Sequence, residues 1–234
     1  MKNVSVIIPA RNEEAFIGAC LKSVFAQPEE YLAEVIVADS STDEATRNVC
    51  EQYNVKIVPG GYPAAARNNG ARHATGEFLL FLDADTQLPE NFFKRVLPEF
   101  EHRQLGVASF YLSPIPAQKK SKATLAVYNR LSYMLAAIHS PFFLTAGCSI
   151  FVRRALHQSI GGFQEGPTVL EEYDYIKRAK GAGMFGVMKI SVATSMRRFS
   201  GKQSLKQTLI LFYHYFKWML TGKLGATSAG YLQE

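Results

Sequence analysis

Hydrophobic and polar positions follow two alternating patterns in the first part of the chain. Short apolar runs rich in β-branched residues predict strands at 4–8, 34–38, 55–58 and 78–82. Apolar positions at helical spacing predict helices at about 15–25, 43–53, 64–74 and 90–101. Continuous apolar runs are typical of buried parallel strands, and helices make the crossovers between such strands. The alternation therefore predicts an α/β fold with a doubly wound, mostly parallel sheet flanked by helices.

The strict alternation is lost in the second part of the chain. Strands are predicted at 106–113, 149–152 and 187–193. Helices are predicted at 119–138, 153–160, 171–182 and 204–221. No internal repeat, low-complexity tract or flexible linker separates the two parts, so we predict one domain over residues 1–234.

The composition indicates an ordinary globular protein with a basic balance of charge. Of the 234 residues, 47% are hydrophobic and 20% are charged, and the formal net charge is +6. A positive charge favours anionic partners, such as a nucleotide diphosphate or an anionic membrane surface. Lysine and arginine are scattered along the chain rather than gathered in a stripe, which argues against nucleic acid as a partner.

Cysteine usage and hydropathy bear on the compartment. Cys20, Cys50 and Cys148 are widely spaced and form no CxxC pair, so they indicate neither a disulfide framework nor a zinc site, and they fit a reducing compartment. No signal peptide is visible. The apolar stretches 134–152 and 209–220 are interrupted or too short for a membrane span of about 20 residues. We therefore expect a cytoplasmic protein, with peripheral contact at the inner face of the membrane left open.

Polar residues follow three of the predicted strands, at 11–14, 39–43 and 83–85. Doubly wound sheets bind ligands beyond the carboxyl ends of their strands, so these residues are the candidate site. Asp83 and Asp85 are two positions apart, and strand alternation would point both carboxylates the same way. Paired carboxylates repel each other unless a cation neutralises them, and oxygen ligands suit Mg²⁺ or Mn²⁺. The alternative is a strand-end turn with one capping aspartate.

Two further segments are expected at the same edge of the sheet. In 39–43, Ser41, Thr42 and Asp43 fit the capping of the following helix, whereas Asp39 at the strand end is free to read a base or a ribose. Arg67 lies in a helix that opens near this edge. It would either meet a diphosphate or be a solvated helix residue.

The second part of the chain holds an acidic and a basic cluster. Glu171, Glu172 and Asp174 begin a predicted helix, where one of them would act as a general base or all would complement the helix dipole. Arg197 and Arg198 follow the last predicted strand. They would form a basic lid over a leaving diphosphate or a solvated loop.

In this order the segments resemble the family 2 glycosyltransferases of the GT-A fold. The resemblance extends from Val4 to about Lys202 and rests on five matching segments, at 4–14, 36–43, 66–70, 75–85, and 161–163 with 171–174. It implies a GT-A, Rossmann-like sheet with a C-terminal acceptor-side helical region. We accordingly expect a nucleotide-sugar-binding half at 1–105, an acceptor-binding half at 106–203, and an amphipathic C-terminal helix and tail at 204–234.

The resemblance also implies roles for the residues around the nucleotide. Asp39 would accept a hydrogen bond from the base, Asp83 would reach the ribose or the metal, and Asp85 would ligate the Mn²⁺ or Mg²⁺ that bridges the diphosphate. The other implied nucleotide-binding residues are Pro9, Ala10, Arg11, Glu13, Arg67, Ala84, Gln87 and Arg198.

Two departures from the family pattern affect the acceptor side. Glu172 stands where the family usually carries its catalytic aspartate and is one methylene longer, which leaves Glu171 or Asp174 as alternative bases. Ala38 stands where many members carry another aspartate. Gln87 and the stretch 198–205 are similar to members that use polyprenyl-phosphate acceptors, which are already anionic and need no strong base.

The implied reaction is an inverting, metal-dependent transfer of a sugar from a UDP- or GDP-linked donor to a hydroxyl or lipid-phosphate acceptor. There are three rival interpretations. A haloacid-dehalogenase-like phosphatase would use 83–86 as its DxDxT loop, and a nucleotidyltransferase would need a glycine-rich loop that 9–13 lacks. The third is a relative that binds the donor without turnover. The final helix at 204–221 would either pack on the core or lie on a membrane.

Overall fold

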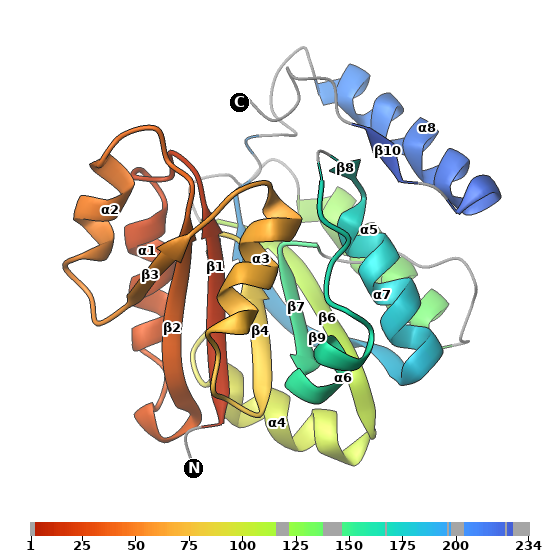
Figure 1. Ribbon diagram of the computed structural model, residues 1–234. Coiled ribbons are helices and arrows are strands. Elements are labelled where there is room, and N and C mark those ends of the chain that lie inside the picture. Colours follow the sequence, from red (N-terminus) through yellow and green to blue (C-terminus); the bar gives the residue numbers. More distant parts are fainter. Residues whose placement is uncertain are drawn as a thin grey trace.

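The computed structural model describes residues 3–115, 122–137, 147–166, 168–195, 197, 204–222 and 224–226. Figure 1 shows the helices and strands along the chain. Their order and bounds are β1 (Val4–Ala10), α1 (Ile17–Phe25), the 3₁₀ turn η1 (Glu29–Tyr31), β2 (Leu32–Asp39), α2 (Ala45–Cys50), β3 (Lys56–Pro59), α3 (Pro63–Arg72), β4 (Phe78–Leu82), β5 (Thr86–Gln87), α4 (Phe92–His102), β6 (Leu105–Pro114), α5 (Lys122–Ala137), β7 (Ser149–Arg153), α6 (Arg154–Ser159), β8 (Thr168–Val169), α7 (Glu171–Ala182), β9 (Met184–Thr194), α8 (Ser204–Thr221) and β10 (Gly225–Ala226).

A sheet with the strand order β3-β2-β1-β4-β7-β6-β9-β5 runs through the middle of the molecule (Figure 1). Strands β1, β2, β3 and β4 pair in parallel, and so do β6 and β9. Strand β7 is antiparallel to both of its neighbours, β4 and β6, and β5 is antiparallel to β9. The predicted α/β fold with a mostly parallel sheet and flanking helices is confirmed.

Both faces of the sheet are buried, because the apolar strand residues alternate between two cores. In β4, Phe78, Leu80 and Leu82 belong to the first core, whereas Leu79 and Phe81 belong to the second. The first core is completed by α1, α2 and α4, and the second by α3, α5 and α7. This two-sided burial explains why β4 reads as a continuous apolar run.

Most predicted elements agree with the structure to within three residues at each end. The strand at 78–82 and the helices at 171–182 and 204–221 have the predicted bounds. The two-residue strands β5, β8 and β10 were not predicted. Their pairing with distant strands defines them, and two residues carry no periodicity of their own.

The strand directions place the ends of six strands at one edge of the sheet. The carboxyl ends of β1, β2 and β4 meet there because these strands are parallel. Strand β7 runs the other way, so it begins at this edge, and Ser149 pairs with Leu82. Strand β6 is antiparallel to β7, and β9 is parallel to β6, so both strands end at this same edge. The residues just before Ser149 and just after Thr194 therefore lie at the same edge as the predicted loops after β1, β2 and β4.

The C-terminal helix α8 packs on α7 through aromatic side chains. Trp218 is 1% exposed, and its ring centroid lies 6.2 Å from that of Tyr173. Strand β10 pairs with β8 just before α7 and ties the end of the described chain to the same region. The opposite side of α8 exposes Tyr213, Phe216 and Leu220. Among the helices described, none has the length and apolar character needed to cross a membrane.

Candidate functional site

The loops that follow β1 and β2 are joined into one wall of the site. Asn12 has a φ of 53°, a left-handed conformation that asparagine tolerates better than most residues. Its backbone N–H donates to Ser41 Oγ at 2.9 Å, and its Oδ1 accepts from the Thr42 N–H at 3.0 Å. The Ser40 N–H donates to the Ala10 carbonyl oxygen at 2.9 Å. These bonds fix the nucleoside-side loop predicted from the sequence.

Asp39 ends β2 inside this wall and is partly engaged by its neighbours. Its Oδ1 accepts from the Ser41 N–H at 3.0 Å and from Ser41 Oγ at 2.6 Å. Its Oδ2 lies 3.9 Å from Arg47 Nη2. Of the predicted capping residues, Asp43 accepts from the Ala45 N–H at 2.9 Å, although the N-cap of α2 is Glu44, whose side chain makes no capping bond. Asp39 Oδ2 therefore faces Arg47, and Asp39 does not bond to the backbone at the start of α2.

Asp83 and Asp85 lie on the turn between β4 and β5, not on the strand itself. The expectation that strand alternation aligns them is therefore wrong. The turn is closed by the Thr86 N–H, which donates to the Asp83 carbonyl oxygen at 3.0 Å. Ala84 is buried in the core between them, so this residue has only backbone atoms to offer a ligand.

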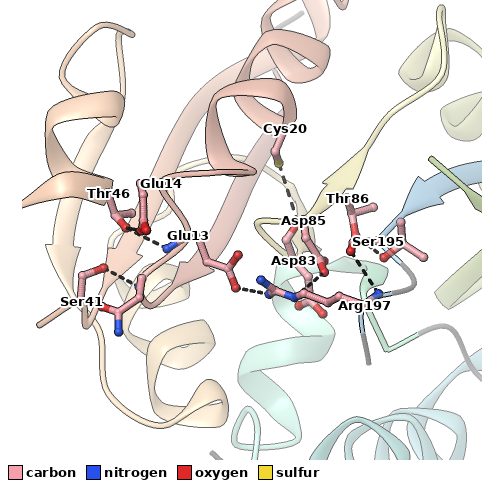
Figure 2. Close-up of polar contacts among 12 residues, drawn as sticks. Glu13, Glu14, Cys20, Ser41, Thr46, Asp83, Asp85, Thr86, Ser195 and Arg197 are labelled. Carbon is pink, nitrogen blue, oxygen red and sulfur yellow. Dashed lines mark hydrogen bonds and ion pairs between the residues drawn. The ribbon is translucent and has the colours of Figure 1, made fainter. Parts of the chain in front are cut away.

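Arg197 reaches across the site from the end of β9 (Figure 2). Its Nη2 forms a hydrogen-bonded ion pair with Glu13, and its Nε lies 3.5 Å from Asp85 Oδ2. Burial works against the charged guanidinium, but the bond to Glu13 and the charges of Glu13, Asp85 and Asp83 outweigh it and raise the pKa of Arg197. A cation thus already stands beside the paired aspartates. Arg198 lies outside the described residues.

The aspartate pair suits a hard divalent cation that also takes oxygen ligands from its substrate. Within the described ranges, His, Cys, Asp and Glu form no group of three that would hold a metal alone. Mg²⁺ and Mn²⁺ need no such cage, because phosphate oxygens and water complete their shells. Cys20 Sγ donates to the Asp83 carbonyl oxygen at 3.8 Å, and burial raises the pKa of Cys20 and raises that of Cys148 to about 12. Burial therefore disfavours the thiolate form that either cysteine would need to bind a metal, which favours oxygen ligands at this site.

Arg67 is buried beneath the aspartates, with 3% of its side chain exposed. Its Nη2 donates to Asp83 Oδ1 at 3.0 Å and lies 3.9 Å from Glu172 Oε1, and its Nη1 donates to Glu171 Oε1 at 3.1 Å. Its guanidinium carbon lies 5.4 Å from the ring centroid of Phe163. The interpretation of Arg67 as a solvated helix residue is wrong, because its side chain is buried and pairs with carboxylates from the turn after β4 and from α7.

The three acidic residues at the start of α7 differ in accessibility. Glu171 is 8% exposed, and burial, followed by the charge of Glu172, raises its pKa to about 7. Asp174 is 9% exposed and accepts from Arg178 Nε at 2.7 Å. Glu172 is 22% exposed and has the longest separation from its cation, 3.9 Å to Arg67. Glu172 is therefore the carboxylate that this arrangement leaves open to a ligand.

Asn68 is a site residue that the sequence did not reveal. Its Oδ1 accepts from the Phe163 N–H at 2.8 Å, and its Nδ2 donates to the Phe163 carbonyl oxygen at 2.9 Å. A Cβ on Gly162 would stand 2.6 Å from Asn68 Oδ1, so this close approach requires the glycine. The available signal was the pair Arg67-Asn68 directly after three alanines in a helix near the sheet edge.

The remaining predicted nucleotide residues among those described lie around this edge. Pro9 and Ala10 end β1, and Arg11 is exposed at the tip of the following loop. Gln87 lies on β5, where it pairs with Ala193 of β9. The structure therefore brings Glu13, Asp83, Asp85 and Glu172 close together through two arginines and places Pro9, Ala10, Arg11 and Gln87 on the surrounding walls.

Comparisons with known proteins identify a family for the sequence. The sequence model described as Glycosyl transferase family 2 matches residues 5–159. The uncharacterized glycosyltransferase EpsJ of Bacillus subtilis is 29% identical over 111 residues, which are 44% of this chain and 32% of that protein. The chain spans about a third or less of the first curated relatives it matches.

Two solved structures show the same fold. The mannosyltransferase PcManGT of Pyrobaculum calidifontis, in complex with GDP-Man and Mn²⁺, has a TM-score of 0.70 at 23% identity, over 95% of this chain and 66% of that one. Glucosyl-3-phosphoglycerate synthase of Mycobacterium tuberculosis, in complex with Mn²⁺, UDP and phosphoglyceric acid, has a TM-score of 0.65 at 19% identity, over 98% of this chain and 81% of that one.

Proposed function

Because the chain belongs to glycosyl transferase family 2, we propose that it transfers a sugar from a UDP- or GDP-linked donor to an acceptor hydroxyl or lipid phosphate. The observation that carries the proposal is the convergence of Asp83, Asp85 and Glu172 at one sheet edge, with buried Arg67 between them. Family membership leaves no place for the phosphatase interpretation of the aspartate pair.

The nucleotide would occupy the wall formed by the loops after β1 and β2. Asp39 would accept from the base, and Pro9, Ala10, Arg11 and Glu13 would contact the nucleoside. Because PcManGT is in complex with GDP-Man and the glucosyl-3-phosphoglycerate synthase with UDP, the base of the donor for this chain would be either guanine or uracil. Arg197 already pairs with Glu13 beside Asp85, so an incoming diphosphate would meet this cation.

Asp85, with Asp83, would hold Mn²⁺ or Mg²⁺ when the donor is bound. Such an ion supplies positive charge to the diphosphate oxygens and so favours their departure. Arg197 would add a second positive charge from the protein itself. Arg67 holds Asp83 in place through its 3.0 Å hydrogen bond and thereby fixes one of the two carboxylates before any ligand arrives.

The transfer would be a single displacement at the anomeric carbon. The acceptor oxygen forms the new bond on one face of the sugar while the bond to the diphosphate oxygen breaks on the other, so the configuration inverts. Glu172 would take the proton of an acceptor hydroxyl. An acceptor that is already an ionised phosphate brings no proton to remove, and Glu172 would then only orient it.

Binding of the donor nucleotide tests the first half of the proposal. We expect UDP or GDP to raise the Tm of the protein in the presence of Mn²⁺ or Mg²⁺ and to have little effect in a chelator. Asp85→Asn, which keeps the shape and removes the charge, should abolish the metal-dependent shift. An undiminished shift in Asp85→Asn would show that the site is assigned to the wrong residues.

Turnover tests the second half and separates an enzyme from a donor-binding relative. We expect release of UDP or GDP from the matching sugar nucleotide in the presence of acceptor, measured as coupled nucleoside diphosphate production. Glu172→Gln should lower kcat with a hydroxyl acceptor while leaving the nucleotide-dependent Tm shift in place. Nucleotide binding without turnover over a panel of sugar and lipid-phosphate acceptors would favour the inactive relative.

We also propose an anionic membrane surface as a partner through α8. Tyr213, Phe216 and Leu220 are exposed on the side of α8 away from Trp218. From Tyr175 to Gln233 the sequence carries Lys and Arg but neither Asp nor Glu. An apolar stripe in a basic surrounding is the pattern of an interfacial helix.

Vesicle flotation tests this partner without removing the helix. Deleting α8 would also remove Trp218 and β10 from α7 and β8, so replacement of Tyr213, Phe216 and Leu220 by serine is the cleaner variant. We expect the parent to float with vesicles containing phosphatidylglycerol and the triple variant to remain in solution. Equal flotation of both proteins, or flotation of neither, would contradict the proposal.

A further inference from the structure

Gly147 lies directly against the carboxylate of Glu172. A Cβ built on Gly147 would stand 2.8 Å from Glu172 Oε1 and 3.0 Å from both Cδ and Cγ. Its φ lies outside the left-handed region, so the backbone conformation alone does not require glycine. Glycine is needed at this position because the Glu172 carboxylate occupies the space that a side chain would take.

The backbone at Gly147 is held at a fixed place beside the aspartate pair. The next residue, Cys148, accepts a hydrogen bond from the Asp83 N–H at 2.9 Å. Strand β7 then begins at Ser149, which pairs with Leu82 of β4. Because two consecutive pairings anchor this segment to β4, Gly147 has little freedom to move away from Glu172.

The other side of the Glu172 carboxylate is bounded by Arg67. Glu172 Oε1, the atom closest to the position of the Gly147 Cβ, is also the atom 3.9 Å from Arg67 Nη2. The same Nη2 donates to Asp83 at 3.0 Å. Asp83, Cys148, Gly147, Glu172 and Arg67 thus form a closed ring of neighbours, in which Glu172 fills the gap between Gly147 and the guanidinium.

We propose that Gly147 is a positioning residue for Glu172. The missing side chain at position 147 provides the room that the longer carboxylate needs and sets its distance from Asp83 and Arg67. A methyl group there would displace Oε1 and Cδ toward the guanidinium or out of the site. The inference rests on the proposed role of Glu172 in transfer and names the residue on which its position depends.

A double-mutant cycle between Gly147→Ala and Glu172→Asp tests the inference. A displacement of about 1 Å in a reacting group can cost about 100-fold in rate, so we expect Gly147→Ala to lower kcat by about tenfold or more. The KM for the donor and the nucleotide-dependent Tm shift should change little. In the Glu172→Asp background, which keeps the contact at Cγ but lacks the 2.8 Å contact with Oε1, Gly147→Ala should cost clearly less than in the parent.

Gly181→Ala is the matched control, because nothing lies within 4 Å of the Cβ position at Gly181. It should leave kcat unchanged. An equal loss from Gly147→Ala in the parent and in the Glu172→Asp background would overturn the inference, because the effect would then act through the backbone. Full activity of Gly147→Ala would overturn it as well.

Two readouts separate failure of this inference from failure of the proposed function. If Glu172→Gln retains full activity with a hydroxyl acceptor, the role of Glu172 is wrong, whereas an inactive Glu172→Gln beside an active Gly147→Ala counts against Gly147 alone. If no acceptor supports turnover, the same cycle is measured in urea denaturation midpoints. Gly147→Ala should lower the midpoint of the parent more than that of the Glu172→Asp variant, and equal shifts would overturn the proposed contact.

Discussion

The guanidinium of Arg67 donates a 3.0 Å hydrogen bond to Asp83, and the same group donates to Glu171 at 3.1 Å. Asp83 follows β4 in the first half of the chain, whereas Glu171 opens α7 in the second half. A single buried cation therefore balances carboxylates from both halves. Burial disfavours the charge on Arg67, but Asp83, Glu172 and Glu171 outweigh it and raise its pKa, so it stays charged.

Replacement of Arg67 by methionine should be strongly destabilising. It would leave the buried Glu171 and the half-buried Asp83 without their cation, and breaking a buried ion pair in this way costs about 3–5 kcal/mol. The free energy of unfolding in urea measures the loss. Arg72→Met, on the exposed side of the same helix with a 3.6 Å ion pair to Glu165, should cost at most about 1 kcal/mol. Similar losses in the two variants would contradict the central role of Arg67.

The stability of the protein should depend on the titration of Glu171. Its pKa is raised to about 7 from an ordinary value of 4.5, first by burial and then by Glu172. Between these values the folded state binds a proton that the unfolded chain has released, so the free energy of unfolding falls as pH rises from about 4.5 to about 7. The total change is at most about 3 kcal/mol. In Glu171→Gln this part of the slope should disappear, and an unchanged slope would show that Glu171 is ionised throughout.

Local pattern was sufficient to predict the elements that carry the site. The run Phe78–Leu82 is buried on both faces, so its continuous apolar character marked the strand and its end. Glu171–Ala182 has acidic residues in its first turn and a glycine after its last residue, which are standard boundary signals. The order of strands and helices then placed the loops after β1, β2 and β4 at one edge.

Contacts between distant segments could not be read from the sequence. Arg67 and Glu171 are 104 residues apart, and nothing local distinguishes a buried arginine from a solvated one. Gly147 also has no local signature, because its importance lies in the side chain of Glu172 on another element. The position of Gly147 is set by the pairing of β7 with β4, and the direction of that pairing is not encoded in the periodicity of the strand.

Asn68 should stabilise the acceptor side through the backbone of Phe163. Asn68→Ala would leave the buried N–H and carbonyl of Phe163 unpaired, at about 1–3 kcal/mol for each group. Asn68→Asp should destabilise at least as much near neutral pH, because a carboxylate would face the Phe163 carbonyl oxygen and the carboxylate of Glu165. Urea unfolding measures both, with Asn48→Ala at an exposed position of α2 as control. A milder effect of the aspartate than of the alanine would show that the amide donor is dispensable.

Trp218 should report the docking of α8 on α7, because it is the single tryptophan of the chain. It is buried against Tyr173, and Lys177 Nζ lies 4.9 Å from its ring centroid. We expect the blue-shifted fluorescence emission of a buried indole in the parent and a red shift in Tyr173→Ala, which opens the contact to water. Phe216→Ala alters the exposed side of the same helix and should leave the emission unchanged. Trp218→Ala should lower the free energy of unfolding by about 3 kcal/mol, as loss of a buried aromatic side chain does. If Tyr173→Ala keeps the parent spectrum, the contact between Tyr173 and Trp218 does not hold α8 on α7. The orientation of α8 that exposes Tyr213, Phe216 and Leu220 would then be wrong.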